Sequence, residues 1–112
     1  MKVIIENNVP GRILAYYQNV MKKYKNTYSL ENLINNVNKV ESETYKVGTE
    51  LRKVNPSTSH IVSKWKGYNI DYSNDTGWYF AYKIEGDIIH VYDAENYANM
   101  DDKAYTSQNI SI

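Results

Sequence analysis

The spacing of apolar residues changes once along this chain, and that change constrains the fold more than any other feature. Between residues 12 and 44 the apolar positions recur every three or four residues, as on one face of a helix. From residue 68 to residue 92 they alternate with polar positions, as in a strand that buries one side. A helical segment followed by a stranded one predicts an α+β fold.

The first half predicts a short strand and two helices. Residues 1–6 are rich in β-branched side chains, as strands are. We expect Asn8 to cap the first helix, with Pro10 in its first turn, where the missing N–H costs little. The second helix should follow Ser29 and run to about Thr44, antiparallel to the first. The two apolar stripes contain Ile13, Tyr17, Val20, Met21 and Tyr24, then Leu30, Leu33, Ile34, Val37 and Val40.

Three strands with tight turns are predicted for the second half. The turns read NDTG and EGD, which place Gly, Asn and Asp where positive φ is needed. In the middle strand every second residue faces the same way, and we expect that side to fill the core beneath the helices. The residues on that side are Trp78, Phe80, Tyr82 and Ile84.

The whole order is a short N-terminal strand, a helical hairpin and a three-stranded antiparallel meander. We expect one sheet with the helices on one face, β-α-α-β-β-β. At 112 residues the chain suits a single domain. We place that domain at residues 1–100 and a C-terminal tail at 101–112.

Charge is balanced overall but unevenly distributed. Residues 1–56 carry nine Lys/Arg and five Asp/Glu, for a net +4, whereas residues 57–112 carry four and eight, for a net −4. The acidic second half disfavours general binding to nucleic acid. Cysteine is absent from the sequence, which excludes disulfides, zinc–thiolate sites and thiol nucleophiles.

The apolar run near the N-terminus is short. It is too short for a signal peptide or a membrane span, so we expect a soluble, cytoplasmic protein that binds no membrane.

The element order and the run SKWKGYNIDYSNDTGWYFAYKIEGDIIHVYDAENY resemble the RelE/ParE superfamily of bacterial type II toxin–antitoxin toxins. The matching pieces are Trp65 and Gly67 before the meander, the aromatic WYFAY of its middle strand and the closing VYDAENY. The resemblance covers roughly residues 1–97. It implies a bacterial or mobile-element toxin that a cognate antitoxin neutralises.

RNA-cleaving members of that superfamily are strongly basic around the scissile phosphate. Here Tyr79 or a neighbour stands where the middle strand usually offers Arg, and the last strand ends in Asp93 and Glu95. This difference favours action by macromolecular binding, as in the ParE branch, over RNA cleavage.

Candidate site residues gather on and beside the predicted sheet. General acid–base chemistry would use His90 or Glu95 with Tyr79 or Tyr97. The alternative is that Tyr79 and Lys83 form a solvent-facing side while His90 packs between its apolar neighbours. Partner binding would use Tyr79, Lys83, Lys64, Lys66 and Tyr97, since large rings bind at a low entropic cost.

Two further interpretations concern Trp65 and the acidic segment. Trp65 between Lys64 and Lys66 fits either a base-stacking site or a core anchor, and the core anchor is favoured. The acidic run DAENYANMDD lacks the spacing of a calcium loop, and we expect no metal and no cofactor.

The sequence therefore predicts a toxin-type small protein that acts mainly by binding a macromolecule. A non-catalytic binding or inhibitor protein encoded by a phage or mobile element is the alternative. A ribosome-dependent mRNA endonuclease with an atypical site is a second alternative. A protein partner is expected, either a cognate antitoxin or a target.

Overall fold

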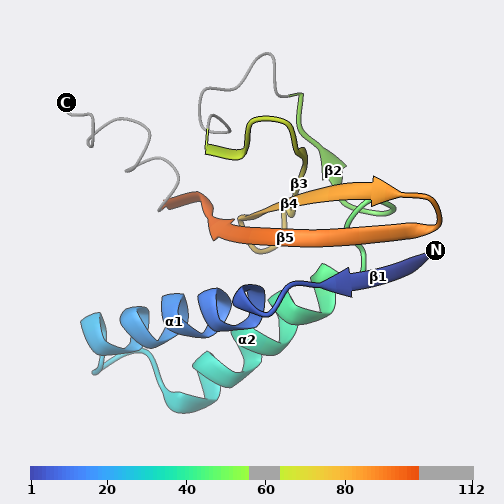
Figure 1. Cartoon of the computed structure of the whole chain (residues 1–112). Helices are drawn as coiled ribbons and strands as arrows, with labels where there is room; N and C mark the ends of the chain where they lie inside the picture. Colours follow the sequence, from blue (N-terminus) through green and yellow to red (C-terminus); the bar gives the residue numbers. More distant parts are fainter. Residues whose placement is uncertain (56–63, 99–112) are drawn as a thin grey trace, which may run out of the picture.

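The computed structural model describes residues 1–55 and 64–98 and confirms the predicted α+β architecture. The elements are β1 (Lys2–Ile5), α1 (Asn8–Lys23), α2 (Leu30–Thr44), β2 (Arg52–Lys53), β3 (Asn69–Tyr72), β4 (Trp78–Glu85) and β5 (Ile88–Asn96). Figure 1 shows the two helices lying side by side along one side of the sheet. The predicted tail, 101–112, lies outside the described residues.

Among the described residues, the sheet has five strands in the order β1-β5-β4-β3-β2. β1 runs parallel to β5, and the other neighbours are antiparallel. The meander of three hairpin-linked strands is confirmed. The two-residue strand β2 was not predicted, because two residues are too few to show a period.

The start of α2 follows local capping chemistry, whereas the start of α1 does not. Ser29 caps α2 as predicted, and a reciprocal pair of hydrogen bonds with Asn32 completes a capping box. The prediction for α1 was wrong by one residue, since Asn7 occupies the cap position without a side-chain bond. Asn8 is the first helical residue, and its side chain is turned to β5 instead.

The main core fills the space between the helices and the sheet. Trp78 and Phe80 are fully buried there, and the Trp78 indole donates to the Tyr17 hydroxyl over 3.0 Å. The buried members of this core are Val9, Ile13, Tyr17, Leu33, Val40, Val47, Trp78, Phe80, Tyr82, Ile89, Val91 and Ala94.

Some predicted core positions lie at the surface. Ile84 is 50% exposed, because the β4–β5 turn extends beyond the ends of both helices (Figure 1). Leu30 and Ile34 are also exposed, since α2 turns Leu33 and Val40 towards the sheet instead. Tyr24 is exposed because α1 has already ended at Lys23.

Close packing requires a glycine in the connection between α2 and the sheet. Gly48, with φ of +84°, follows α2, and a Cβ at this position would lie 2.8 Å from Cδ1 of the buried Ile89. Glycine therefore serves both the left-handed backbone and the close approach. Across the described residues, no helix is both long and apolar enough to cross a bilayer.

Candidate functional site

The sheet face turned away from the helices, here called the outer face, carries paired tyrosine rings. The β3–β4 register sets Tyr72 opposite Tyr79, with 4.6 Å between ring centroids. On the other side, β2 sets Arg52 opposite Tyr72, and the guanidinium lies 4.9 Å from the ring centroid. This separation is within the range of a cation–π contact.

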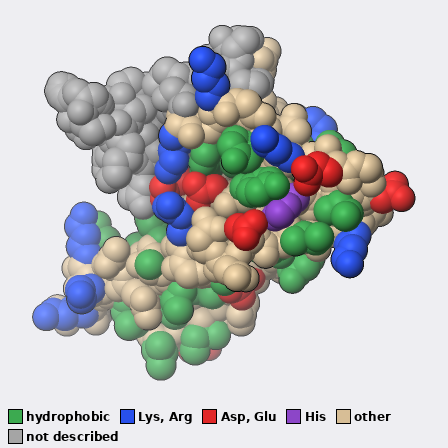
Figure 2. All heavy atoms as spheres, viewed as in Figure 1, with side chains coloured by type: hydrophobic (Ala, Val, Ile, Leu, Met, Phe, Trp, Pro, Cys, Tyr) green, Lys and Arg blue, Asp and Glu red, His purple; other side chains and the backbone are tan. Residues whose placement is uncertain are grey.

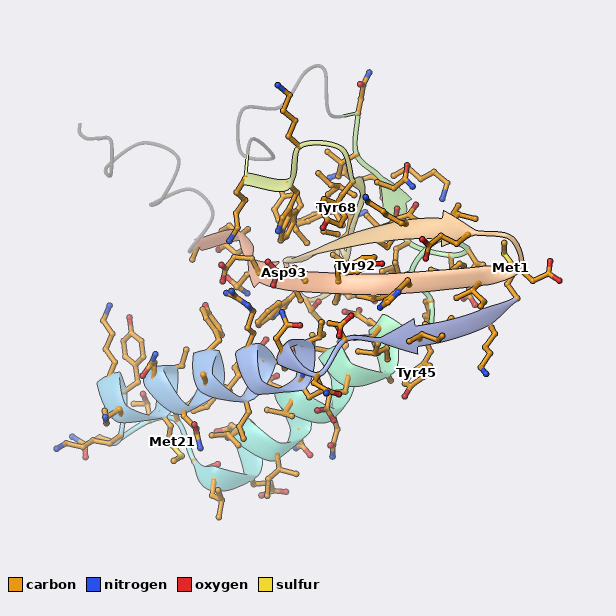
Figure 3. The ribbon with its side chains drawn as sticks, viewed as in Figure 1. Met1, Met21, Tyr45, Tyr68, Tyr92 and Asp93 are labelled. Carbon is orange, nitrogen blue, oxygen red and sulfur yellow. The ribbon has the colours of Figure 1, made fainter. Side chains whose placement is uncertain are left out.

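A second group of rings lies along β5. Tyr68 and Tyr92 meet edge to face at 5.4 Å, and Lys83 Nζ lies 4.7 Å from the Tyr68 centroid. His90 stacks on Tyr92 with 3.9 Å between centroids. Figure 3 shows Tyr68 and Tyr92 turned towards one another. We call the two groups together the tyrosine–cation surface: Tyr68, Tyr72, Tyr79 and Tyr92 with Arg52 and Lys83.

This surface is mixed in character. Its four tyrosines are half-buried, whereas Arg52 and Lys83 are exposed. Figure 2 shows hydrophobic side chains of this face beside Lys and Arg residues and around the histidine. Rings that are held partly buried keep few rotamers to lose on binding.

Trp65 covers the middle of the outer face. The indole is 4% exposed and packs on Ile70 and Ala81, which form a second small core with it. The core-anchor interpretation of Trp65 is thus confirmed. The tyrosines do not decorate a bare sheet, because Tyr68 and Tyr79 pack against this second core.

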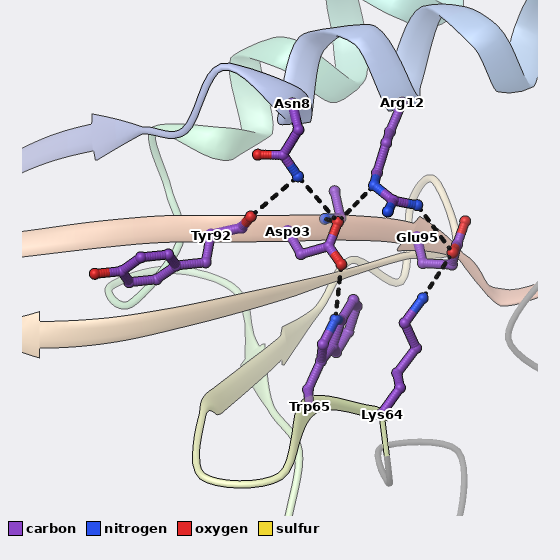
Figure 4. A network of polar contacts seen from close by, with 8 residues as sticks. Asn8, Arg12, Lys64, Trp65, Tyr92, Asp93 and Glu95 are labelled. Carbon is purple, nitrogen blue, oxygen red and sulfur yellow. Dashed lines mark hydrogen bonds and ion pairs between the residues drawn. The ribbon is translucent and has the colours of Figure 1, made fainter.

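Residues 64–68, which carry Trp65 and lead into β3, are here called the covering segment. A network of carboxylates holds this segment in place (Figure 4). Asp93 Oδ2 accepts the Trp65 indole N–H at 2.9 Å, and Oδ1 pairs with Arg12 Nε at 2.9 Å. Glu95 Oε2 pairs with Lys64 Nζ at 2.9 Å and with Arg12 Nη1 at 3.6 Å. Asn8 adds a bond of 3.2 Å to the Tyr92 carbonyl and a longer one of 3.5 Å to Asp93.

Strand lengths explain how a helix reaches this network. β1 pairs with β5 only as far as Val91, so the start of α1 lies beside the rest of that edge. A bulge then shifts the register, with Val91 opposite Tyr82 but Asp93 opposite Ala81. A bulge re-aims the side chains that follow it. Arg12 thereby meets both carboxylates.

The candidate acid–base residues lie in three separate places. Tyr79 and Glu95 are opposite each other, but His90 lies opposite Lys83, five residues along β5 from Glu95. That spacing corresponds to about 16 Å along a strand. Tyr97 follows β5 and packs on Gly77, where a Cβ would come within 2.7 Å of the ring.

Each of these groups has structural neighbours. His90 Nε2 lies 2.8 Å from Glu6 Oε2, and Nδ1 lies 3.9 Å from Glu85 Oε1. Glu95 is held by two cations, as described above. Of the predicted partner-binding residues, Tyr79 and Lys83 belong to the tyrosine–cation surface and Lys64 to the carboxylate network. Lys66 is exposed on the covering segment.

Two buried carboxylates on the helix side were not predicted. Asp71 is fully buried and accepts from the Gly48 N–H at 2.7 Å and the Tyr82 hydroxyl at 2.9 Å. Burial raises the pKa of Asp71, and burial followed by the bond to Asp71 raises the pKa of Tyr82. Glu43 accepts from the hydroxyls of Ser73 and Thr76, both at 2.6 Å.

The sequence around Asp71 contains a signal for burial, but it allows two interpretations. Asp71 sits among apolar residues in NIDYS, where alternation alone allowed either face to be buried.

An apolar pocket of about 330 Å³ opens between β1 and the helices and contains none of the candidate residues. Within residues 1–55 and 64–98, no three His, Asp or Glu side chains gather as a metal site.

Comparison with known proteins adds no relative to this description. No family model, no curated protein and no solved structure matches the chain.

Proposed function

We propose that the chain is a toxin-type protein of RelE/ParE-like architecture that acts by binding a macromolecular partner. The tyrosine–cation surface is the observation that carries this proposal. It combines rings fixed by their neighbours with exposed cations, and tyrosine and arginine are enriched where proteins bind one another. A cognate antitoxin would neutralise the protein.

The order of elements supports the RelE/ParE-like part of the proposal. A first strand, a helical hairpin and a meander occur in the same sequence as in that superfamily. The extra strand β2 adds Arg52 to the outer face without changing this order.

Binding accounts for the outer face better than RNA cleavage does. General acid–base catalysis needs its groups within hydrogen-bond reach of one reacting centre. His90 and Glu95 are separated along β5, and Tyr97 packs at the β3–β4 turn. Glu95 is also engaged by Arg12 and Lys64. The outer face therefore offers contacts in two places rather than one reaction centre.

The first experiment is tightly controlled induction of this chain alone in a bacterial culture. We expect growth arrest, and measuring translation and DNA supercoiling in the arrested cells separates action on the ribosome from action on gyrase. Unimpaired growth in several hosts would contradict a toxin and would leave the binding or inhibitor protein.

A matched pair of variants then tests the surface itself. Lys83→Glu reverses a charge on the tyrosine–cation surface, whereas Lys39→Glu reverses one on the exposed side of α2. We expect Lys83→Glu to abolish the arrest and Lys39→Glu to retain it. Equal behaviour of the two variants would remove the outer face from the proposal.

A further inference from the structure

The two edges of the sheet differ in their capacity to pair with another strand. β2 forms one edge and has only two residues, both basic and exposed. Short, charged edge strands resist pairing. β1 forms the other edge with four residues, KVII, and has neither a proline nor a bulge. Figure 1 shows β1 as the outermost strand beside β5.

The backbone of β1 presents hydrogen-bonding groups at that edge. The N–H of Lys2 donates to the Asp87 carbonyl and that of Glu6 to the Val91 carbonyl. In a parallel ladder, every second residue turns its N–H and C=O to the same neighbour. Lys2, Ile4 and Glu6 therefore bond to β5, and Val3 and Ile5 direct theirs outwards.

The side chains of the inward-bonding residues lie on the outer face. Ile4 is opposite His90 in the register, and the Ile4 residue is 37% exposed. Lys2 is exposed, and the Glu6 side chain is 45% exposed while its Oε2 bonds to His90. A positive and a negative side chain thus flank an exposed isoleucine, two residues away on either side.

We propose that β1 pairs antiparallel with β1 of a second copy of this chain, about a two-fold axis at Ile4. Val3 then faces Ile5 of the second copy on both sides of the axis, and the outward groups form four hydrogen bonds. The two Ile4 side chains meet at the axis. Two five-stranded sheets join into one continuous sheet.

The charges on β1 favour a second copy of this chain as the strand that pairs with it. In this register Lys2 lies opposite Glu6 of the second copy, and the same pair forms again across the axis. Opposite charges directly across an antiparallel pair stabilise it, and like charges destabilise it. A strand shifted by one residue would lose both pairs. This inference does not depend on the proposed function, because the tyrosine–cation surface plays no part in it.

The sharpest test reverses the charges at residues 2 and 6 one at a time. Dimer formation is measured by sedimentation equilibrium of the full chain, with any tag placed at the C-terminus. The wild type should be a concentration-dependent dimer. Lys2→Glu alone sets Glu against Glu, and Glu6→Lys alone sets Lys against Lys. Each should dimerise about tenfold more weakly, because two attractive pairs become repulsive. An equimolar mixture of the two variants should recover dimers, since both pairs are then attractive.

A backbone variant tests the same edge without changing charge. Val3→Pro removes an outward N–H and leaves the ladder to β5 intact, which edge strands tolerate. We expect a folded monomer whose thermal midpoint falls slightly, because the half-buried Val3 side chain also packs against the main core. A wild type that stays monomeric up to millimolar concentration would overturn the proposal. So would dimers that are insensitive to Val3→Pro, or charge variants that fail to recover on mixing.

Discussion

The indole of Trp65 donates to Asp93 Oδ2 over 2.9 Å, between residues 28 positions apart in the sequence. The other oxygen of the same carboxylate pairs with Arg12 at 2.9 Å. One carboxylate therefore joins α1, β5 and the segment that leads into β3. The middle of the outer face is covered because this side chain holds Trp65 over Ile70 and Ala81.

Removing the charge of Asp93 should loosen this covering. We expect Asp93→Asn to lower the free energy of unfolding by about 1–3 kcal/mol, because the amide cannot accept bonds on both sides. Urea denaturation measures the change. Asp87→Asn in the exposed β4–β5 turn is the control and should shift the midpoint little. Equal effects of the two variants would mean that Asp93 is not a structural residue.

The pair itself can be isolated with a double-mutant cycle. Trp65→Phe keeps an apolar ring over Ile70 and Ala81 but removes the donor, at an expected cost of about 1–3 kcal/mol. Combined with Asp93→Asn, it should cost less than the sum of the single changes, because both remove the same bond. Additive effects would show that the two side chains do not interact in solution.

The buried Asp71 should give stability a recognisable pH dependence. Its pKa is raised in the folded protein by burial, so the folded state binds a proton more tightly than the unfolded state does. Stability should then fall as pH rises from about 3.9, the ordinary value, through the raised pKa. Asp71→Asn lacks this titration.

The measurement is the difference in unfolding free energy between wild type and Asp71→Asn at successive pH values. The wild type should lose stability relative to the variant as pH increases through that window. A difference that is flat, or that moves in favour of the wild type, would contradict a raised pKa.

Two glycines with similar backbone angles allow the cost of backbone strain to be measured apart from the cost of close packing. Gly48 and Gly67 have φ of +84° and +90°, but only at Gly48 would a Cβ meet another atom, Cδ1 of Ile89 at 2.8 Å. We expect Gly67→Ala to cost about 1 kcal/mol from the backbone alone. Gly48→Ala should cost about 1–3 kcal/mol more. Thermal or urea unfolding of both variants tests the difference, and equal costs would contradict the close approach.

The sequence predicted every element except β2 well, because each of the others has its own period or cap. Ser29 starts α2 where a capping residue precedes an apolar stripe, and Gly48 follows the helix. Alternation placed Trp78, Phe80 and Tyr82 in the core, as the structure confirms. Alternation could not place Ile84, since burial also requires a helix above that part of the strand.

The candidate site was harder to predict, because its contacts depend on tertiary structure. The sequence shows Asp93 and Glu95 only as the acidic end of the last strand, and the bulge in β5 brings them to Arg12. The Arg52–Tyr72 contact depends on β2, a strand without a sequence pattern. The sequence does not show the contact of His90 either, because its partner Glu6 comes from the other end of the chain.

We propose that the outer face binds a macromolecular partner and does not cleave RNA. The most direct test compares two double variants in the induced-growth assay, with folding checked by circular dichroism. His90→Ala with Tyr97→Phe removes two of the four candidate acid–base groups, and Arg52→Glu with Lys83→Glu reverses both cations of the tyrosine–cation surface. We expect the first pair to arrest growth as the wild type does and the second pair not to. Loss of arrest in the first pair with arrest retained in the second would contradict this proposal.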